Sequence, residues 1–173
     1  MNNTKNNQKV CIAASAGGHL TEILQLNKIW TGKKYFFISD KRINALSLAK
    51  KEKTYFILPP RRSYIRTVIA FIQTFFILLK ENPNIIISTG AEIGYPALII
   101  GHYLGKKTIY IETLARVNSS SLCGKLVYGK VDYFYVQWPE SKKLFPKATY
   151  VGSVFEWKKK SLLLLEAPTH LTD

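Results

Sequence analysis

The sequence has few cysteines, few acidic residues and no long apolar run. Its 173 residues include two cysteines, Cys11 and Cys123, which exclude a disulfide framework and a cysteine-rich zinc site and fit a reducing compartment. Residues 1–8 are polar and lack the apolar core of a signal peptide. In the most apolar region the longest uncharged run covers only residues 67–79, whereas about 20 residues are needed to cross a bilayer. We therefore expect no membrane-spanning helix.

Acidic residues are scarce: Asp and Glu number 11, whereas Lys and Arg number 25, so the formal net charge is +14. Such a charge indicates an anionic partner: nucleic acid, an acidic membrane surface or a phosphate-bearing substrate. Nothing else in the sequence supports a nucleic-acid binder, since it has no base-stacking signature and no helix-turn-helix pattern. Hydrophobic residues make up 47% of the chain, enough to bury a sizeable core.

Short apolar runs alternate with helical patterns along the chain. Runs without polar alternation, separated by helices, predict an open, Rossmann-like parallel sheet with helices on both faces. We expect a disordered N-terminus at residues 1–8, one domain at residues 9–155 and a tail at residues 156–173 that contacts a partner. The expected strands are residues 9–14, 34–39, 54–58, 85–88, 108–111, 131–136 and 150–154. The expected helices are residues 19–30, 40–51 (with Asp40 as N-cap), 63–80, 91–104 and 118–130.

The first turn at the carboxyl edge of this sheet, where such folds bind ligands, contains Ser15, Gly17, Gly18 and His19. The glycines allow close backbone approach, and the following helix N-terminus suits a phosphate. His19 can act as a base or a hydrogen-bond donor near neutral pH. The alternative is a tight turn with a solvated histidine. The glycine spacing does not fit a dinucleotide site, although Asp40 is placed where such a site has its acid. We expect no cofactor and no metal.

Two further turns follow the fourth and fifth strands. Thr89, Gly90, Glu92 and Gly94 form a second small-residue turn with free N–H groups, or a simple turn in which Glu92 offsets the helix dipole. Glu112 directly follows a strand, so we expect its carboxylate to face the ligand crevice. Arg116 can clamp a phosphate. The alternative for these two residues is an internal ion pair.

Two aromatic segments remain. Gln137, Trp138 and Glu140 follow the strand at residues 131–136, where the indole can stack on a sugar, contact another protein or belong to the core. Residues 63–80 form a helix that is apolar nearly all round. Three arginines crowd the N-terminus of that helix against its dipole, which suits contact with anionic lipid while aromatic residues enter the bilayer. The alternative is a buried helix with solvated arginines. The predicted membrane contacts are Arg61, Arg62, Arg66, Phe71 and Phe75.

Four segments within residues 10–155 carry a family resemblance: SAGGHLTEIL, STGAEIGYP, IETLARVNSSSLCGKLVYGKVDYFYVQWPE and VGSVF. They resemble the non-donor subunit of split, two-chain glycosyltransferases. One branch of that family is the eukaryotic subunit in dolichol-linked N-acetylglucosaminyl transfer. The other is the bacterial enhancer-type subunit of capsule and exopolysaccharide assembly. The resemblance implies the N-terminal half of a GT-B enzyme, inactive without a donor-binding partner chain. The eukaryotic subunit carries an N-terminal membrane anchor, and we expect none in this sequence. This expectation favours the bacterial branch and peripheral attachment at the cytoplasmic face of the membrane.

The resemblance also implies roles for the residues above. The chain would bind a sugar-diphosphate-polyprenol acceptor, to which a sugar is transferred from a UDP-sugar. His19 is the first candidate for the base and Glu112 the second. A non-catalytic adaptor that holds a complete transferase at the membrane is the alternative. The acceptor or phosphate contacts would be Ser15, Gly17, Gly18, Thr89, Gly90, Glu92, Gly94 and Arg116. The partner contacts would be Gln137, Trp138, Glu140 and Phe155.

Overall fold

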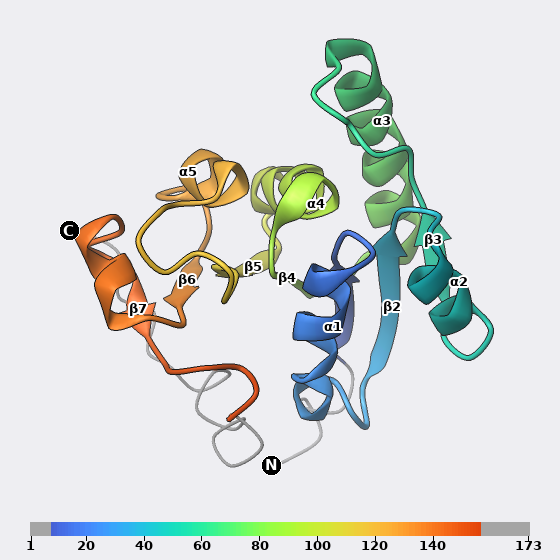
Figure 1. Ribbon diagram of the computed structural model, residues 1–173. Coiled ribbons are helices and arrows are strands. Elements are labelled where there is room, and N and C mark those ends of the chain that lie inside the picture. The colour runs from blue at the N-terminus through green and yellow to red at the C-terminus, as the bar shows by residue number, and fades with distance from the viewer. Residues whose placement is uncertain (1–7, 157–173) are drawn as a thin grey trace.

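The computed structural model describes residues 8–156, which form a seven-stranded parallel sheet with helices on both faces (Figure 1). Every neighbouring pair is parallel, in the order β3-β2-β1-β4-β5-β6-β7. The predicted fold class is confirmed. The strands are β1 (Lys9–Ala13), β2 (Lys34–Ser39), β3 (Thr54–Phe56), β4 (Ile85–Ser88), β5 (Lys107–Ile111), β6 (Tyr133–Val136) and β7 (Thr149–Tyr150).

Five α-helices accompany the sheet in the described residues, with short 3-10 helices at Asn27–Ile29 and Pro139–Lys143. Two separate cores follow from this arrangement. One lies between the sheet and α3, α4 and α5, and includes Phe36, Leu98 and Phe134. The other lies on the opposite face, under α1 and α2, and includes Ile12 and Ile23. The helices are α1 (Gly18–Leu24), α2 (Ile43–Ala49), α3 (Tyr64–Glu81), α4 (Ala91–Tyr103) and α5 (Leu122–Val127).

Three helices are shorter than predicted. The helix expected at residues 19–30 ends at Leu24 and gives way to a 3-10 turn. Asp40 does not cap α2, because its carboxylate accepts the Ala16 N–H at 2.7 Å and pairs with Arg42, so that α2 begins at Ile43. The helix expected at residues 118–130 begins only at Leu122.

The strand order reverses between β1 and β4. From β1 the chain runs outward through β2 to β3, and α3 then carries it back to β4 on the other side of β1. The turns after β1 and β4 therefore meet at the carboxyl edge without a helix crossing between them, which is where open α/β sheets bind ligands.

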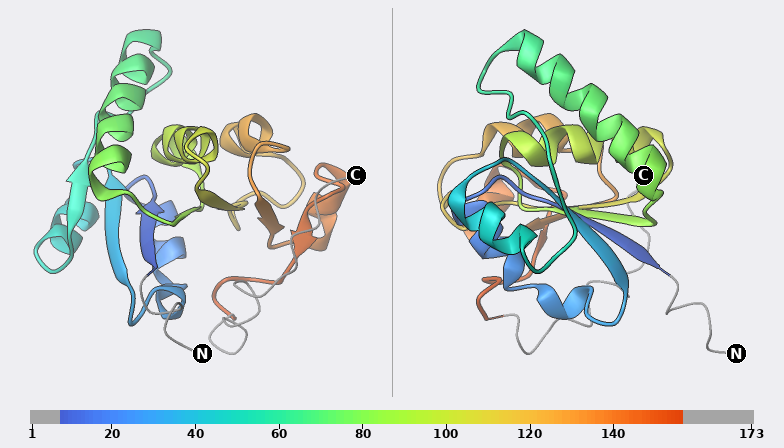
Figure 2. Two further views of the ribbon diagram at one scale, coloured as in Figure 1. Left: turned by 180° about the vertical axis from the view of Figure 1, so that it is seen from behind. Right: turned by 90° about the vertical axis from the view of Figure 1, so that its right-hand side faces the viewer.

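Helix α3 projects from the molecule at its N-terminal end (Figure 2). Its buried residues, Ala70, Thr74, Leu78 and Glu81, all lie from its second turn onward. We call the apolar residues on its exposed side the outer stripe, which comprises Ile65, Val68, Ile69, Ile72, Phe76 and Leu79, with Ile65 75% and Phe76 63% exposed. Contiguous apolar surface of this kind marks a contact with another protein or a membrane.

The inner end of α3 is fixed by a buried carboxylate. Glu81 receives Lys53 at 2.8 Å, Lys9 at 2.5 Å and the Tyr55 hydroxyl at 2.5 Å. Burial alone would raise the pKa of Glu81, but the hydrogen bonds from Lys53, Lys9 and Tyr55 outweigh it and hold that pKa at about 2. This network ties α3 to β1 and β3.

The depressed pKa of Glu81 predicts a pH-dependent stability. A carboxyl whose pKa falls on folding stabilises the protein fully above its unfolded value of 4.5, and this contribution is lost as the pH falls toward 2. We expect Glu81→Gln to lower the free energy of unfolding at neutral pH by about 2–3 kcal/mol and to flatten its pH dependence in that window. Urea titrations from pH 7 to pH 3 measure both effects. The exposed Glu140→Gln variant should behave as wild type, and equal loss in both variants would contradict the account.

Candidate functional site

Two glycine turns with nearly the same backbone conformation face each other at the switch point. Gly17 (φ 111°, ψ −141°) precedes α1, and Gly90 (φ 96°, ψ −142°) precedes α4. Only glycine adopts these angles without strain. A Cβ on Gly90 would also lie 3.1 Å from the Tyr110 hydroxyl. The predicted glycine turns therefore occur at the predicted edge.

Reciprocal hydrogen bonds join the two turns through His19 and Thr89. The His19 Nδ1 lies 2.9 Å from the Thr89 carbonyl oxygen, and the Thr89 hydroxyl donates to the His19 carbonyl at 3.0 Å. Because a carbonyl oxygen can only accept, Nδ1 must carry the proton of this bond. In the neutral ring, Nε2 is then the nitrogen with the free lone pair. The contact thus orients the ring and sets its tautomer.

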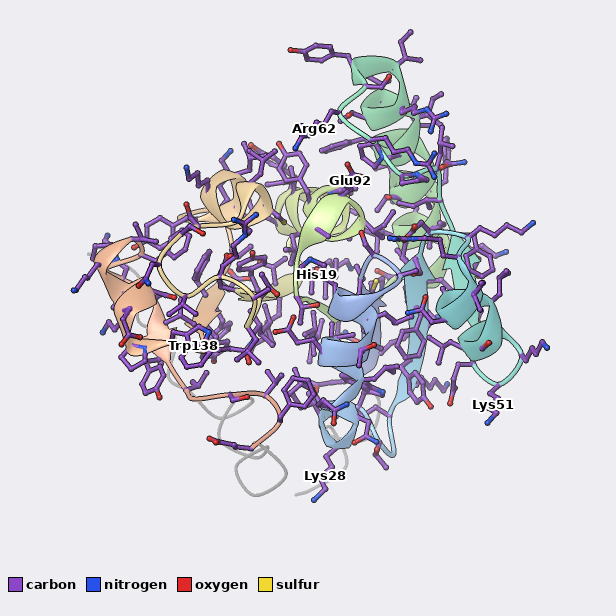
Figure 3. The ribbon with its side chains drawn as sticks, in the orientation of Figure 1. His19, Lys28, Lys51, Arg62, Glu92 and Trp138 are labelled. Atoms are coloured by element: carbon purple, nitrogen blue, oxygen red, sulfur yellow. The ribbon has the colours of Figure 1, made fainter. Side chains whose placement is uncertain are left out.

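His19 lines a cavity of about 770 Å³, which we call the switch-point cavity. Its walls come from the start of α3, the start of α4, α5 and the loop after β5. Arg62, Glu92 and Arg116 line it together with His19, and Figure 3 shows Arg62, Glu92 and His19 between α3, α4 and α1. Its further lining residues include Tyr64, Thr67, Tyr95, Thr113, Ser121, Leu122 and Leu126. Four polar residues that the sequence analysis had singled out as site or membrane contacts thus line the switch-point cavity, whose walls are partly apolar.

The N-terminus of α4 borders this cavity. The Ser15 hydroxyl accepts the Ile93 N–H in the first turn of the helix at 3.3 Å, and the Gly90 N–H is bound to Ser88 Oγ. Within residues 8–156 the N–H groups of Ala91 and Glu92, which both line the cavity, have no acceptor. Ala91 has a left-handed φ of 59°, a conformation that costs a non-glycine residue about 1–3 kcal/mol and persists where the surroundings impose it.

Several predicted phosphate contacts serve the framework instead. Ser15 is buried, and its hydroxyl accepts the Ile93 N–H of α4. Gly94 faces the sheet, since a Cβ there would lie 2.1 Å from Ser88 Oγ. It therefore allows α4 to approach β4, and the expectation of an approach to ligand at this position is wrong. Gly18 is exposed at the start of α1.

Glu112 does not face the crevice, and that expectation is wrong. Its side chain is only 1% exposed, and its carboxylate accepts the Tyr110 hydroxyl at 2.7 Å and the Ser121 N–H at 2.9 Å. Burial, together with Cys123 and Glu112, raises the pKa of Tyr110 and keeps it a donor. No ion pair joins Glu112 to Arg116 in the described part of the chain. Arg116 is exposed and donates to Ser119.

The sequence reasoning missed a further buried carboxylate near the site, Glu22 of α1. It accepts the Thr113 hydroxyl at 3.0 Å and the Leu114 N–H at 2.6 Å, and it receives the side-chain amide of Gln137. Glu22 thus holds the loop that carries Arg116 against the helix that carries His19. Its place one turn after His19, beside the buried Ile23, was the only sequence signal for this role.

The predicted partner contacts differ in their exposure. Gln137 is 2% exposed, donates to Glu22 and to the Glu112 carbonyl, and accepts the Val154 N–H at 2.8 Å. Its side chain is buried, so its assignment as a partner contact is wrong. Trp138 is half-buried and donates to the Leu114 carbonyl at 2.8 Å. Glu140 and Phe155 are exposed, and their role stays a prediction. All but the first residue of the predicted tail at residues 156–173 lies outside the described residues.

The predicted membrane contacts in α3 and in the turn before it lie in different surroundings. Arg62 lines the switch-point cavity, whereas Arg61 and Arg66 line a separate hollow. Phe71 packs edge-to-face on Tyr95 of α4 and is half-buried, and its contact with the membrane stays a prediction. Phe75 is 39% exposed and contacts Phe76.

Residues 8–156 contain no helix whose length and apolar character would let it span a bilayer. No group of three or more His, Cys, Asp and Glu side chains there could hold a metal ion.

The fold is that of one Rossmann-like lobe of a GT-B protein. The chain superposes on Acinetobacter baumannii MurG with a TM-score of 0.68 at 14% identity, covering 84% of this chain and 44% of MurG. On UDP-GlcNAc 2-epimerase from Methanocaldococcus jannaschii the TM-score is 0.70 at 11% identity, covering 93% of this chain and 50% of the epimerase. The chain therefore spans about half of each of these proteins.

Sequence relationship then identifies the family. Residues 57–154 match the family described as "Oligosaccharide biosynthesis protein Alg14 like". The UDP-N-acetylglucosamine transferase subunit ALG14 of Rattus norvegicus is 30% identical, over 83% of this chain and 81% of the rat protein. This chain belongs to the Alg14-like family, which confirms the resemblance drawn from its motifs.

The three hydrogen bonds to Glu22 predict a stability effect. Glu22→Ala leaves the Leu114 N–H and the Gln137 amide without their acceptor, so we expect the free energy of unfolding to fall by about 2–4 kcal/mol. Glu22→Gln retains one oxygen acceptor and should lose less. Urea denaturation of both variants measures the difference. Equal stability of Glu22→Ala and wild type would contradict the proposed network.

Proposed function

We propose that this chain is the acceptor-binding, membrane-associated subunit of a two-chain glycosyltransferase. The observation that carries the proposal is the switch-point cavity, which brings His19, Arg62, Glu92 and Arg116 together beside the N-terminus of α4. The curated relative named above is a UDP-N-acetylglucosamine transferase subunit. The substrates in this proposal are a UDP-sugar and a sugar linked through diphosphate to a polyprenol.

The cavity suits an acceptor with a charged and an apolar part. The free N–H groups of Ala91 and Glu92 and the guanidinium groups of Arg62 and Arg116 can neutralise a diphosphate. The apolar walls at Tyr64, Leu122 and Leu126 suit the first isoprenoid units of the lipid. Glu92 can accept a hydrogen bond from a sugar hydroxyl.

His19 is the base in this proposal. Its Nδ1 donates to the Thr89 carbonyl, so Nε2 can accept the proton of the acceptor hydroxyl. That hydroxyl oxygen forms a bond to C1 of the donor sugar, the bond from C1 to the diphosphate breaks, and UDP leaves with inversion at C1. Glu112 has no part in this step because its carboxylate is buried against Tyr110 and Ser121.

A separate donor-binding chain completes the enzyme in this proposal. Support comes from the curated relative, whose name describes it as a subunit of a UDP-N-acetylglucosamine transferase. Trp138, Glu140 and Phe155 remain the proposed contacts with that chain. We further propose a role in capsular or exopolysaccharide assembly. This rests on the resemblance to the bacterial branch, whereas the curated relative named above is eukaryotic.

Membrane attachment at the cytoplasmic face is peripheral in this proposal. The outer stripe of α3 would enter the lipid interface, with Phe75 beside it and the arginines near the headgroups. The start of α3 borders the switch-point cavity, so a membrane at the outer stripe lies next to the proposed lipid substrate.

The base assignment predicts the effect of His19 variants on sugar transfer by the complex. We expect His19→Ala to lower the rate by about 10²–10⁴-fold, because a positioned base contributes about that much. His19→Asn retains a donor for the Thr89 carbonyl but has no basic nitrogen, so it should be equally slow. Radiolabelled transfer to lipid is measured with this chain alone, the partner alone and both together.

Three results would contradict this proposal. A loss below about tenfold in His19→Asn would place the base elsewhere and favour an adaptor. Full activity of the partner alone would do the same. Turnover by this chain alone would show that it is not half of an enzyme.

The outer stripe predicts the effect of charged substitutions on vesicle binding. Replacing Ile72 and Phe76 together by Asp should weaken co-sedimentation with vesicles by more than about tenfold, because apolar burial of each side chain is worth more than 1 kcal/mol. The matched control replaces Ile43 and Leu46, two exposed residues of α2, by Asp. Equal loss in both double variants would show that net charge, and not the stripe, decides binding.

A further inference from the structure

A second hollow lies next to the start of α3, on the side away from the switch-point cavity. It has a volume of about 450 Å³, and we call it the arginine pocket after its cationic residues, which are Lys41, Arg42, Arg61 and Arg66. The ends of β2 and β3 and the first turns of α3 supply its walls. Nothing in the proposed transfer reaction uses it.

The charges of this pocket are unbalanced. Asp40 is its one acidic lining residue, and its carboxylate is held by the Ala16 N–H and by Arg42. Lys41, Arg61 and Arg66 have no ion-pair partner among the described residues. The amide oxygen of Gln73 accepts the Leu58 N–H at 2.8 Å, which leaves the NH₂ group of that amide as a further donor.

The backbone at the entrance to α3 is strained. Arg61 and Arg62 are consecutive non-glycine residues with left-handed φ values of 47° and 58°. Arg61 lines the arginine pocket, whereas Arg62 lines the switch-point cavity. Left-handed backbone is unfavourable for residues other than glycine, and such strain gathers at binding sites. The turn thus supplies one guanidinium group to each hollow.

We propose that the arginine pocket binds the phosphate of an anionic phospholipid headgroup. Guanidinium groups bind phosphate oxygens in a bidentate manner. A lipid is the favoured source because the outer stripe of α3 begins at Ile65, directly before Arg66 of the pocket. This inference rests on the proposed membrane attachment. It adds a lipid-selective site that is separate from the acceptor cavity.

The test compares binding of the full chain to phosphatidylcholine vesicles with and without about 30 mol% phosphatidylglycerol. Replacing Arg61 and Arg66 together by Gln should lower binding to the anionic vesicles by about 30-fold, since each basic residue near the surface contributes about 1 kcal/mol. Replacing both by Lys keeps the charge but removes the bidentate geometry, and should still lose about fivefold or more. The Lys50→Gln, Lys51→Gln control removes two charges from the end of α2 and should lose less than about threefold.

Each outcome decides the proposal. If the Arg61→Lys, Arg66→Lys variant binds as wild type, or if the Lys50→Gln, Lys51→Gln control loses as much binding as the arginine variants, the lipid preference comes from diffuse positive charge and not from the arginine pocket. If added inorganic phosphate or UDP abolishes the preference for anionic vesicles, the pocket binds a soluble phosphate compound and not a lipid headgroup. Thermal unfolding by circular dichroism checks that the variants are folded. Binding to neutral vesicles and sugar transfer by the complex test the proposed function separately, so both can hold if the pocket fails.

Discussion

The candidate site depends on the contact between two turns at the point where the strand order reverses. At the carboxyl ends of β1 and β4 the chain leaves in opposite directions, so no crossover fills the space. The turns meet instead through His19 and Thr89, which exchange two hydrogen bonds. This contact determines which nitrogen of His19 carries a proton and which wall of the cavity the ring occupies. Gly17 and Gly90 supply the backbone angles that bring the turns together.

Buried carboxylates hold the remaining walls around that contact. Glu22 fixes the loop after β5 from one side, and Glu112 fixes the start of α5 through Ser121 from the other. Both act through hydrogen bonds to backbone N–H groups, which are costly to leave unpaired in the interior. The exposed parts of the same loop, including Arg116, are thereby free to face the cavity. The framework and the proposed acceptor site thus use different residues of one short segment.

Much of the fold could be predicted from local patterns. The strand runs are apolar without alternation because both faces of the sheet are covered, and the turn glycines mark the edge. The orientation of Glu112 could not be predicted, since it depends on Tyr110 from the strand and Ser121 from the next helix. Gln137 was misassigned for the same reason, because its partners Glu22 and Val154 come from distant segments. For α3 the sequence shows apolar residues all round. The burial of Ala70 and Leu78 in the structure, with the packing of Phe71 on Tyr95, shows which side faces inward.

The most direct test of the central contact is the tautomer of His19. A two-bond ¹H–¹⁵N spectrum of the full chain labelled at histidine reports which ring nitrogen is protonated. The hydrogen bond from Nδ1 to the Thr89 carbonyl predicts that in the neutral ring Nδ1 carries the proton and Nε2 is bare. A spectrum with the proton on Nε2, and Nδ1 bare, would contradict both the contact and the assignment of His19 as the base.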